Sequence, residues 1–448
     1  MKPIEAFFAR ICDDPVGRAF DEEEKSFSPT VSMQTPPAWE GGAFEDFAAR
    51  AFVENAHRSL VLYVHVPFCR RRCAFCPFFK NISDALFSAE YTSLLAKEIS
   101  DTAKTLGSVV RERPVKAIYF GGGTPSDLDS PDLALLIRRL RESFLIAPDA
   151  EITVEGRVRG FTGAKGKAWV DAGANRFSLG VQTADTRLRR RMGRIADRDE
   201  IRAVMNALGE SGAALVLDLI YGFPEQTEEI LLDDIRFVSE ETGIHGLDLY
   251  KLSLFPGSPL DKAIVRGEFP KPPDFAQRAK MYELAYGALL AHGFEPFTPK
   301  HWRRDAKERS VYNRLAFGQT DMIPFGSGAG GRIGSISLGN AGVLADYGEK
   351  VLSGKKPIAR LALSPPKSAS ESFGRLIDEA LEELRLPAIE RWPQSHREKG
   401  KELLSQWREA GLLHSTDSQD ESARLTCAGN FWAPHMKKLL IDFAAQTW

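Results

Sequence analysis

Short apolar runs alternate with longer amphipathic runs from residue 61 to about residue 254. The apolar runs are rich in β-branched residues and predict strands, whereas the amphipathic runs between them predict helices. Such alternation is typical of parallel strands joined by right-handed crossovers. The expected strands are 61–66, 116–120, 151–155, 176–181, 214–220 and 248–254. The expected helices are 43–56, 89–106, 132–144 and 200–210.

Six such strands predict an α/β fold, an open and partial (β/α)6 TIM-like barrel whose site lies at the C-terminal ends of the strands. Residues 1–60 are expected to form an N-terminal extension, with a loop at 28–42, that packs on the outside of the barrel; covering of the active site is the alternative. Residues 61–363 form the barrel, with the segment 300–335 as a lid over the site. A small helical, winged-helix-like module is expected at 364–448, and it begins with a linker at 364–368.

Composition narrows the class of protein. Hydrophobic content of 43% and charged content of 27% are those of a soluble globular protein. The net charge of −2 implies no broad basic surface and disfavours nucleic acid as a partner. No run approaches the roughly 20 apolar residues of a membrane span, and the first residues lack the pattern of a signal peptide. Five cysteines among 448 residues form no disulfide framework, which fits a reducing cytoplasm.

Three of those cysteines, Cys69, Cys73 and Cys76, have the spacing C-x3-C-x2-C directly after the first expected strand. Three thiolates on a short loop can hold three irons of a [4Fe–4S] cluster and leave the fourth iron open, whereas electron-transfer ferredoxins usually fill all four corners with cysteine. A zinc site and cysteines without a common role are the alternatives. Zinc sites more often use C-x2-C pairs and need a fourth protein ligand, and the other two cysteines lie far away in the sequence.

Glycine and polar residues follow the expected strands on the side where the site should lie. The motif GGGTP, at 121–125, follows the second strand, and glycine there permits a close approach of the backbone to a ligand. Glu155, Gln182 and Asp218 stand at or near the ends of the next three strands. A buried carboxylate needs a hydrogen-bonding partner or a ligand. Five arginines follow Gln182, and we interpret most of them as a solvated helix face: Arg187, Arg189, Arg190, Arg191 and Arg194.

The cysteine spacing, with Phe75 before the last cysteine, resembles the signature of the radical S-adenosylmethionine (SAM) superfamily. In that superfamily SAM chelates the fourth iron, and one electron from the cluster cleaves SAM to a 5′-deoxyadenosyl radical. The motifs YVHVPFC, GGGTP, GVQ, MGR and DLIYGFPEQT are similar to those of its coproporphyrinogen-dehydrogenase-like branch, over about 61–330. The resemblance implies a [4Fe–4S] cluster on the three cysteines and two bound SAM molecules.

The same resemblance assigns SAM contacts to residues of this chain. Tyr63, Gly122 and Glu155 match positions that contact the cluster-bound SAM. A second set matches positions that contact the second SAM: Phe75, Gly123, Thr124, Gln182, Arg194 and Asp218. The distance in sequence from Gln182 to Arg194 keeps the family's pattern, which favours Arg194 over its neighbouring arginines as a ligand for a SAM carboxylate.

Within this branch the chain most resembles the anaerobic haem-degrading family ChuW/HutW, the anaerobilin synthases. The long extension carries this resemblance together with CAFCPFFKN, EGR at 155–157, ERSVYNR at 308–314 and PFGSGAGG at 324–331. Coproporphyrinogen dehydrogenases typically have a further cysteine after the cluster motif, where this chain has Pro77 and Phe78. Haem chaperones of the branch usually lack so long an extension.

The implied activity is methyl or methylene transfer from SAM to haem, with opening of the ring and release of iron. Oxygen-independent coproporphyrinogen III dehydrogenase, another SAM methyltransferase and a haem-binding chaperone without turnover stay open as alternatives, and a radical SAM enzyme that acts on RNA is disfavoured by the charge. A flavodoxin or ferredoxin is the usual electron donor.

Haem contacts and catalytic residues are not assigned by these motifs. His301 lies beside Trp302, Arg303 and Arg304, which would suit a flat macrocycle and its propionates, but we interpret it as a residue of a surface loop. His65, next to the cysteine loop, stays open between a structural and a binding role.

Overall fold

The protein was analysed as a computed structural model, which describes residues 2–20, 43–78, 81–82, 85–317, 320–363, 369–414 and 423–446. The loop expected at 28–42 and the linker expected at 364–368 lie outside the described residues. In the described residues, no helix is long and apolar enough to cross a membrane.

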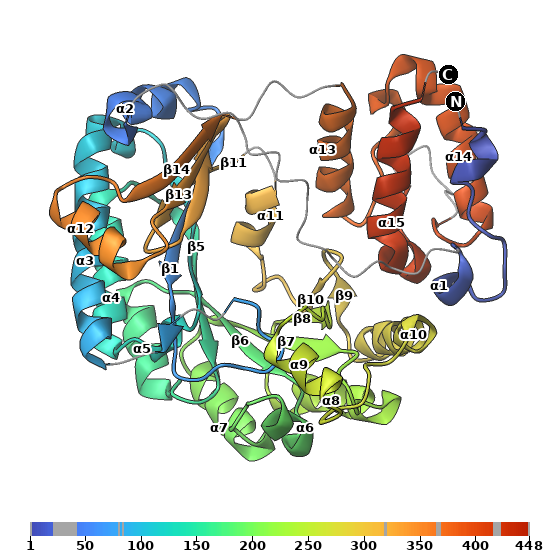
Figure 1. Ribbon diagram of the computed structural model, residues 1–448, viewed down its shortest axis with the longest axis horizontal. Coiled ribbons are helices and arrows are strands. Elements are labelled where there is room, and N and C mark those ends of the chain that lie inside the picture. The colour runs from blue at the N-terminus through green and yellow to red at the C-terminus, as the bar shows by residue number, and fades with distance from the viewer. Residues whose placement is uncertain are drawn as a thin grey trace.

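The core is a curved sheet whose central strands run parallel, with helices on its outer face (Figure 1). Neighbouring strands of this part follow one another in sequence, as expected for a half-open barrel. They are β1 (Ser59–Val66), β4 (Val115–Gly122), β5 (Ile146–Arg157), β6 (Arg176–Gln182), β7 (Ala214–Tyr221) and β8 (Gly246–Lys251). The predicted α/β fold is thus confirmed.

The side chains of β6 alternate between two buried environments. Phe177, Leu179 and Val181 pack in the main hydrophobic core beneath the helices. Arg176 and Gln182, on the opposite face of the strand, are also buried but polar. Because side chains of a strand alternate between its two faces, this pattern marks the inside of the barrel as a polar, enclosed space.

The last expected strand, 248–254, was wrong in its second half. β8 ends at Lys251, and the amide of Leu252 donates instead to the carbonyl of Tyr221 at the end of β7 (2.9 Å). Leu252 then packs with Phe223 and Leu260 in a separate hydrophobic cluster. The apolar residue Leu252, after Lys251, therefore packs in a loop and does not continue the strand.

Most of the segment 300–335, which was expected to form a lid, belongs to the sheet. β11 (Thr320–Phe325) pairs in parallel with β1 and extends the sheet on its open side. Antiparallel strands continue the sheet beyond β11, and two short ones extend its other edge beyond β8. They are β12 (Gly330–Ile333), β13 (Ile336–Asn340) and β14 (Ile358–Leu363) on the first edge, and β10 (His301–Arg303) and β9 (Glu295–Pro296) on the second.

Two further strands and a set of helices complete the barrel. β2 (Phe68–Cys69) and β3 (Asn81–Ile82) pair beside the cysteine loop. The helices are α2 (Phe44–Glu54), α3 (Ala85–Leu106), α4 (Ser130–Ser143), α5 (Gly163–Ala172), α6 (Thr186–Arg191), α7 (Arg198–Gly209), α8 (Glu228–Glu241), α9 (Pro259–Val265), α10 (Phe275–Ala291), α11 (Val311–Phe317) and α12 (Leu344–Leu352).

The C-terminal part forms a small helical module beside α10 (Figure 1). It contains α13 (Ala369–Leu381), α14 (Arg397–Glu409) and α15 (Cys427–Ala444), with an isolated antiparallel bridge between Leu413 and Leu425. Asn430 of α15 donates to the hydroxyl of Tyr282 on α10 (2.8 Å), and Phe275 of α10 packs edge-on against Phe431 of α15. The module is thereby joined to the end of the barrel.

The described part of the N-terminal extension, residues 2–20 with α1 (Pro15–Arg18), packs on this module. The indole N–H groups of Trp407 and Trp432 donate to the carbonyls of Phe7 and Pro15, each at 3.0 Å. This part of the extension lies away from the barrel strands, next to the C-terminus (Figure 1).

Candidate active site

The cysteines predicted to hold a cluster lie on the loop after β1, and none of them forms a disulfide. Cys69 and Cys73 are buried, whereas Cys76 is partly exposed. The Thr124 hydroxyl lies 3.2 Å from Sγ of Cys69, so the turn after β4 contacts the loop after β1. Burial raises the pKa of Cys69 and outweighs the opposite effect of Arg157.

These free thiols suit a cluster better than a single ion. Across the described parts of the chain, no three His, Cys, Asp or Glu side chains are placed to hold one metal ion. Ligands to separate irons of a [4Fe–4S] cube need not converge on one point. Arg194, whose Nε is buried without a hydrogen-bond partner, lies near enough to Cys73 and Cys76 to feel their charge. The residues present therefore fit an anionic thiolate cluster.

The glycines of the GGGTP turn are required by close contacts. A Cβ on Gly123 would lie 2.3 Å from the carbonyl oxygen of Phe68, inside the backbone of the cysteine loop. Gly122 has φ +112°, and a Cβ there would lie 2.5 Å from the imidazole of His65. The amide of Gly123 also donates to the carbonyl of Val66 (2.8 Å). The turn thus holds the cysteine loop against the end of β4. A side chain at either glycine would prevent this close approach.

Glu155 is held beside this turn at the end of β5. Its carboxylate accepts hydrogen bonds from the Tyr119 hydroxyl (2.6 Å) and from the amide of Gly122 (3.2 Å). Burial raises its pKa, against the opposing effect of these two donors. Tyr63, on β1, shares a hydrogen bond of 2.9 Å with Nδ1 of His65. The three residues predicted to contact the cluster-bound SAM therefore lie on three neighbouring strands.

Gln182, Arg194 and Asp218 converge around Gly180 of β6. A Cβ on Gly180 would lie 2.6 Å from Nε2 of Gln182, 3.1 Å from Nη2 of Arg194 and 3.7 Å from Oδ2 of Asp218. The side-chain oxygen of Gln182 is buried without a partner, as is Nε of Arg194. The guanidinium of Arg194 also lies over the ring of Phe75, 5.8 Å from its centre. These unsatisfied polar atoms lie beside the space that glycine leaves open. A polar ligand in that space would supply their missing hydrogen bonds.

Asp218 is the most strongly perturbed carboxyl of this group. Burial and the nearby Asp248 and Glu155 raise its pKa to about 8. In the free protein, Asp218 is thus largely protonated at neutral pH. A cationic ligand, or one that donates a hydrogen bond to Asp218, would favour its ionised form.

A stack of tyrosines beside Glu155 was not anticipated from the sequence. The rings of Tyr119 and Tyr312 stack with centres 4.4 Å apart, and Tyr63 stacks more loosely on both. Tyr312 belongs to α11, whose first two amides donate to the carboxylate of Glu151 on β5. Tyr312 lies in the segment ERSVYNR that carries part of the family resemblance, which was the only signal for it.

His301 is not in a surface loop, contrary to the sequence interpretation. It is 2% exposed on β10, and its ring nitrogens lie 3.0 Å from Asp248 and 3.1 Å from Glu308. Burial lowers the pKa of His301, but the two carboxylates outweigh this effect and raise the pKa to about 9. Nε of Arg176 donates to both carboxylate oxygens of Glu308 (3.1 and 3.0 Å). His301 therefore joins β10 to the barrel through a buried charged network.

Arg189 is an exception in the arginine run, most of which was expected to be a solvated face. This side chain is 1% exposed, and its guanidinium donates to the carbonyls of Val181, Thr183 and Ala196. It ties the loop after α6 to the end of β6. Arg187, Arg190 and Arg191 are exposed, as expected.

Comparison with protein families finds a match to the model described as the radical SAM superfamily, over residues 63–238. Among curated proteins, the chain is 37% identical over 386 residues to the anaerobilin synthase of Escherichia coli O157:H7, covering 86% of this chain and 84% of that protein. It is 29% identical to the haem chaperone HemW of Bacillus subtilis, over 64% of this chain and 74% of that protein.

An oxygen-independent coproporphyrinogen III oxidase, from Escherichia coli K12, is also 29% identical, over 68% of this chain and 69% of its own length. Among solved structures, a coproporphyrinogen III oxidase of Escherichia coli matches with a TM-score of 0.73 and 24% identity, covering 90% of this chain and 93% of that one. This structural match supports the fold.

Proposed function

The chain belongs to the radical SAM superfamily, in the branch of the coproporphyrinogen dehydrogenases, haem chaperones and anaerobilin synthases, and we propose that it degrades haem anaerobically as a SAM-dependent methyltransferase. The observation that carries the proposal is the extent of the similarity to an anaerobilin synthase, 86% of this chain at 37% identity. The similarities to a haem chaperone and to a coproporphyrinogen oxidase are lower and cover 64% and 68% of the chain.

In this proposal, Cys69, Cys73 and Cys76 hold a [4Fe–4S] cluster. The cluster and SAM, when bound, supply a 5′-deoxyadenosyl radical. Tyr63, Gly122 and Glu155 hold the SAM bound to the cluster. A second SAM, as carbon donor, is held by residues that converge on the space beside Gly180 or line the adjacent cysteine loop and turn: Phe75, Gly123, Thr124, Gln182, Arg194 and Asp218.

The described residues contribute positioning and exclusion of water. Gln182 is 8% exposed and Thr124 is 1% exposed, so polar contacts made there are strengthened by low dielectric surroundings. Two SAM molecules held on adjacent strands would stand close to each other and to a substrate at the barrel mouth, which supplies the proximity that transfer of a carbon group needs. The proposed setting is the reducing cytoplasm, with a flavodoxin or ferredoxin as electron donor.

The test is an anaerobic incubation of the reconstituted protein with reductant, SAM and haem. Mass spectrometry follows the tetrapyrrole, 5′-deoxyadenosine and S-adenosylhomocysteine. We expect a methylated, iron-free, ring-opened product with wild type. Cys73→Ala is expected to give none, whereas Cys12→Ala, a cysteine outside the cluster motif, should keep the activity.

Other results identify the alternatives. Consumption of SAM with coproporphyrinogen III but not with haem would assign the chain as a coproporphyrinogen dehydrogenase. Tight binding of haem, returned unchanged without consumption of SAM, would replace the enzyme proposal with the haem chaperone.

A further inference from the structure

Arginines gather around the outer side of the cysteine loop, although the chain as a whole has a net charge of −2. Arg70, Arg71 and Arg72 stand between the first two cysteines and are exposed. Two other segments join them. The side chain of Arg157, the last residue of β5, donates to the carbonyl of Arg71 (2.8 Å), and the carbonyl of Met192, after α6, accepts from the amide of Ala74 (3.1 Å).

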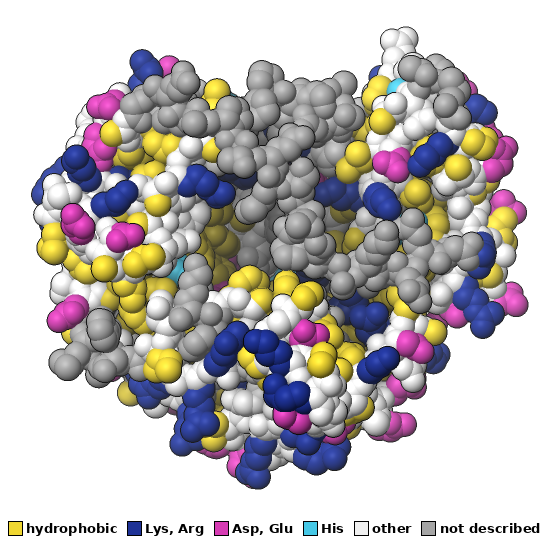
Figure 2. Space-filling model, in the orientation of Figure 1, with side chains coloured by type: hydrophobic (Ala, Val, Ile, Leu, Met, Phe, Trp, Pro, Cys, Tyr) yellow, Lys and Arg dark blue, Asp and Glu magenta, His cyan; other side chains and the backbone are white. Residues whose placement is uncertain are grey.

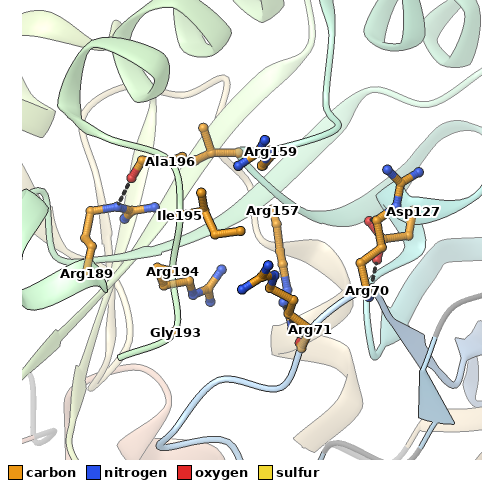
Figure 3. A pocket seen from close by; sticks show the side chains of 11 residues that line it. Arg70, Arg71, Asp127, Arg157, Arg159, Arg189, Gly193, Arg194, Ile195 and Ala196 are labelled. Atoms are coloured by element: carbon orange, nitrogen blue, oxygen red, sulfur yellow. Dashed lines mark hydrogen bonds and ion pairs between the residues drawn. The ribbon is translucent and has the colours of Figure 1, made fainter. Parts of the chain in front are cut away.

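These three segments, residues 70–72, 157–159 and 187–194, form what we call the arginine surface. They enclose a cavity of about 300 Å³ that is lined by six arginines and one carboxylate, that of Asp127. Figure 3 shows Arg71, Arg157 and Arg194 reaching into the same space, while Asp127 lies to the side with Arg70. Like charges that face the same space repel each other, and a bound anion would offset this repulsion.

Several of these arginines have no acidic partner in the described residues. Arg70 pairs with Asp127 (3.5 Å), and Arg191 pairs with Glu225 (3.1 Å). Arg71, Arg159 and Arg190 are exposed and form no ion pair with any described residue. Figure 2 shows Lys and Arg side chains spread over the lower part of the molecule, where Figure 1 places α6 and α7.

Exposed apolar side chains lie on segments that adjoin the cysteine loop. Ile82, paired with Cys69 through β2 and β3, is 71% exposed, and Phe78, just after the last cysteine, is 74% exposed. Val265 of α9 is 81% exposed, and α9 touches the loop through the amide of Leu260, which donates to Ala74 (2.9 Å). Exposed apolar side chains near charged ones are typical of a protein-binding surface.

We propose that the arginine surface is the docking site of an acidic one-electron carrier protein, with carboxylate side chains of that carrier facing the exposed Arg71 and Arg159. The inference rests on the proposed function, because reductive cleavage of SAM requires an electron to enter at the cysteine loop. Charge steers the encounter of such partners, and weak redox complexes need only a small interface. RNA is the competing occupant. The arginines favour a carrier because they surround the loop that the electron must reach.

The test compares two electron donors of opposite charge. Arg71→Glu/Arg159→Glu removes positive charge from the arginine surface without changing a residue assigned to the cluster or to SAM. Arg50→Glu/Lys401→Glu makes the same change in charge at exposed positions on α2 and α14. Stopped-flow absorbance measures cluster reduction by reduced flavodoxin, an acidic carrier, and by reduced methyl viologen, a small cation.

We expect the rate constant with flavodoxin to fall about tenfold or more in Arg71→Glu/Arg159→Glu and to stay within about twofold of wild type in the control. Reduction by methyl viologen should be unchanged or faster in both variants. The wild-type rate with flavodoxin should fall with salt, and that of the arginine variant should not.

An unchanged flavodoxin rate in Arg71→Glu/Arg159→Glu at low salt would overturn the docking proposal, even if methyl viologen drives the reaction normally. Loss of reduction by both donors would also overturn it, because the arginines would then serve the cluster itself. A transfer RNA that binds wild type at physiological salt but not the arginine variant, with normal reduction by flavodoxin, would assign the surface to nucleic acid. Failure of wild type to cleave SAM with methyl viologen would instead count against the proposed function.

Discussion

Asp218 gives the site a measurable dependence of stability on pH. Its pKa in the folded protein is raised to about 8, whereas an unfolded chain has a value of about 3.9. A raised pKa means that the stability from this group is fully present below about pH 4 and is lost as pH rises through about 8. Asp218→Asn should remove that loss. Its melting temperature relative to wild type is expected to rise by roughly 2 °C or more between about pH 5 and pH 8.5.

The matched control for this measurement is Asp346→Asn, an exposed aspartate on α12. Its melting temperature relative to wild type should not vary with pH in this range. An Asp218→Asn variant that tracks wild type at every pH would mean that Asp218 is ionised in the folded protein.

Gly123 is the residue whose replacement should most directly disturb the cysteine loop. A methyl group there would lie 2.3 Å from the carbonyl oxygen of Phe68, and backbone atoms cannot move aside as a flexible side chain would. Gly123→Ala is expected to lower the free energy of unfolding by about 1–3 kcal/mol and to lower the iron content after reconstitution. Urea denaturation and iron analysis measure the two effects.

Gly209→Ala is the control for that substitution. Gly209 is the last residue of α7, and a methyl group there meets nothing within 4 Å. Alanine should be neutral or slightly stabilising there. Equal effects of the two substitutions would contradict the role given to the contact at Gly123.

At the scale of elements, the parallel strands of the barrel were predictable and the edges of the sheet were not. Strands such as 61–66 are continuous apolar runs, because helices cover one face of the sheet and the enclosed site the other. β9 and β10 are only two and three residues long, and β12 begins with two glycines. Such segments carry too little periodicity to predict a strand, and the sequence alone therefore does not place 300–335 in the sheet.

The site residues also fall into those that the sequence predicts and those that only the fold reveals. The cysteine spacing and the strand-end glycines are local in sequence, so motifs located them. The network of His301, Glu308 and Arg176 joins residues more than a hundred positions apart, and only the fold brings them together. His301 was consequently misplaced at the surface.

Glu308 is the centre of that network and anchors the segment that leads into α11. It is 0% exposed and lies between Arg176 and His301. Glu308→Ala would leave Arg176 buried without its ion-pair partner and His301 paired with Asp248 alone, so we expect the free energy of unfolding to fall by about 3–5 kcal/mol. Glu398→Ala, at an 87% exposed side chain on α14, should change it by no more than about 0.5 kcal/mol. A small effect of Glu308→Ala would show that water or a rearranged carboxylate replaces this partner.

At the scale of the whole molecule, the two ends of the chain meet on one small module. Residues 2–20 add no strand to the barrel, but they cover the helices of the C-terminal module with backbone carbonyls and aromatic rings. The carbonyls of Phe7 and Pro15 satisfy two buried indole N–H groups, and Phe7 packs edge-on against Phe443 of α15 (5.5 Å between ring centres). The N-terminal segment is thus part of the core of the module, and its α1 also packs on α10 of the barrel.

Phe7→Ala tests this division of the molecule. Phe7 is 1% exposed, and removal of such a buried ring costs about 3–5 kcal/mol. Because Phe7 contacts the module, the loss should raise hydrogen exchange in α14 and α15 and leave exchange in β4 to β7 unchanged. Ile11→Ala, at a residue that is 60% exposed, should leave both regions as in wild type. If exchange rises equally in the barrel strands, the module and the barrel unfold as one unit, and the extension then stabilises the site as well as the module.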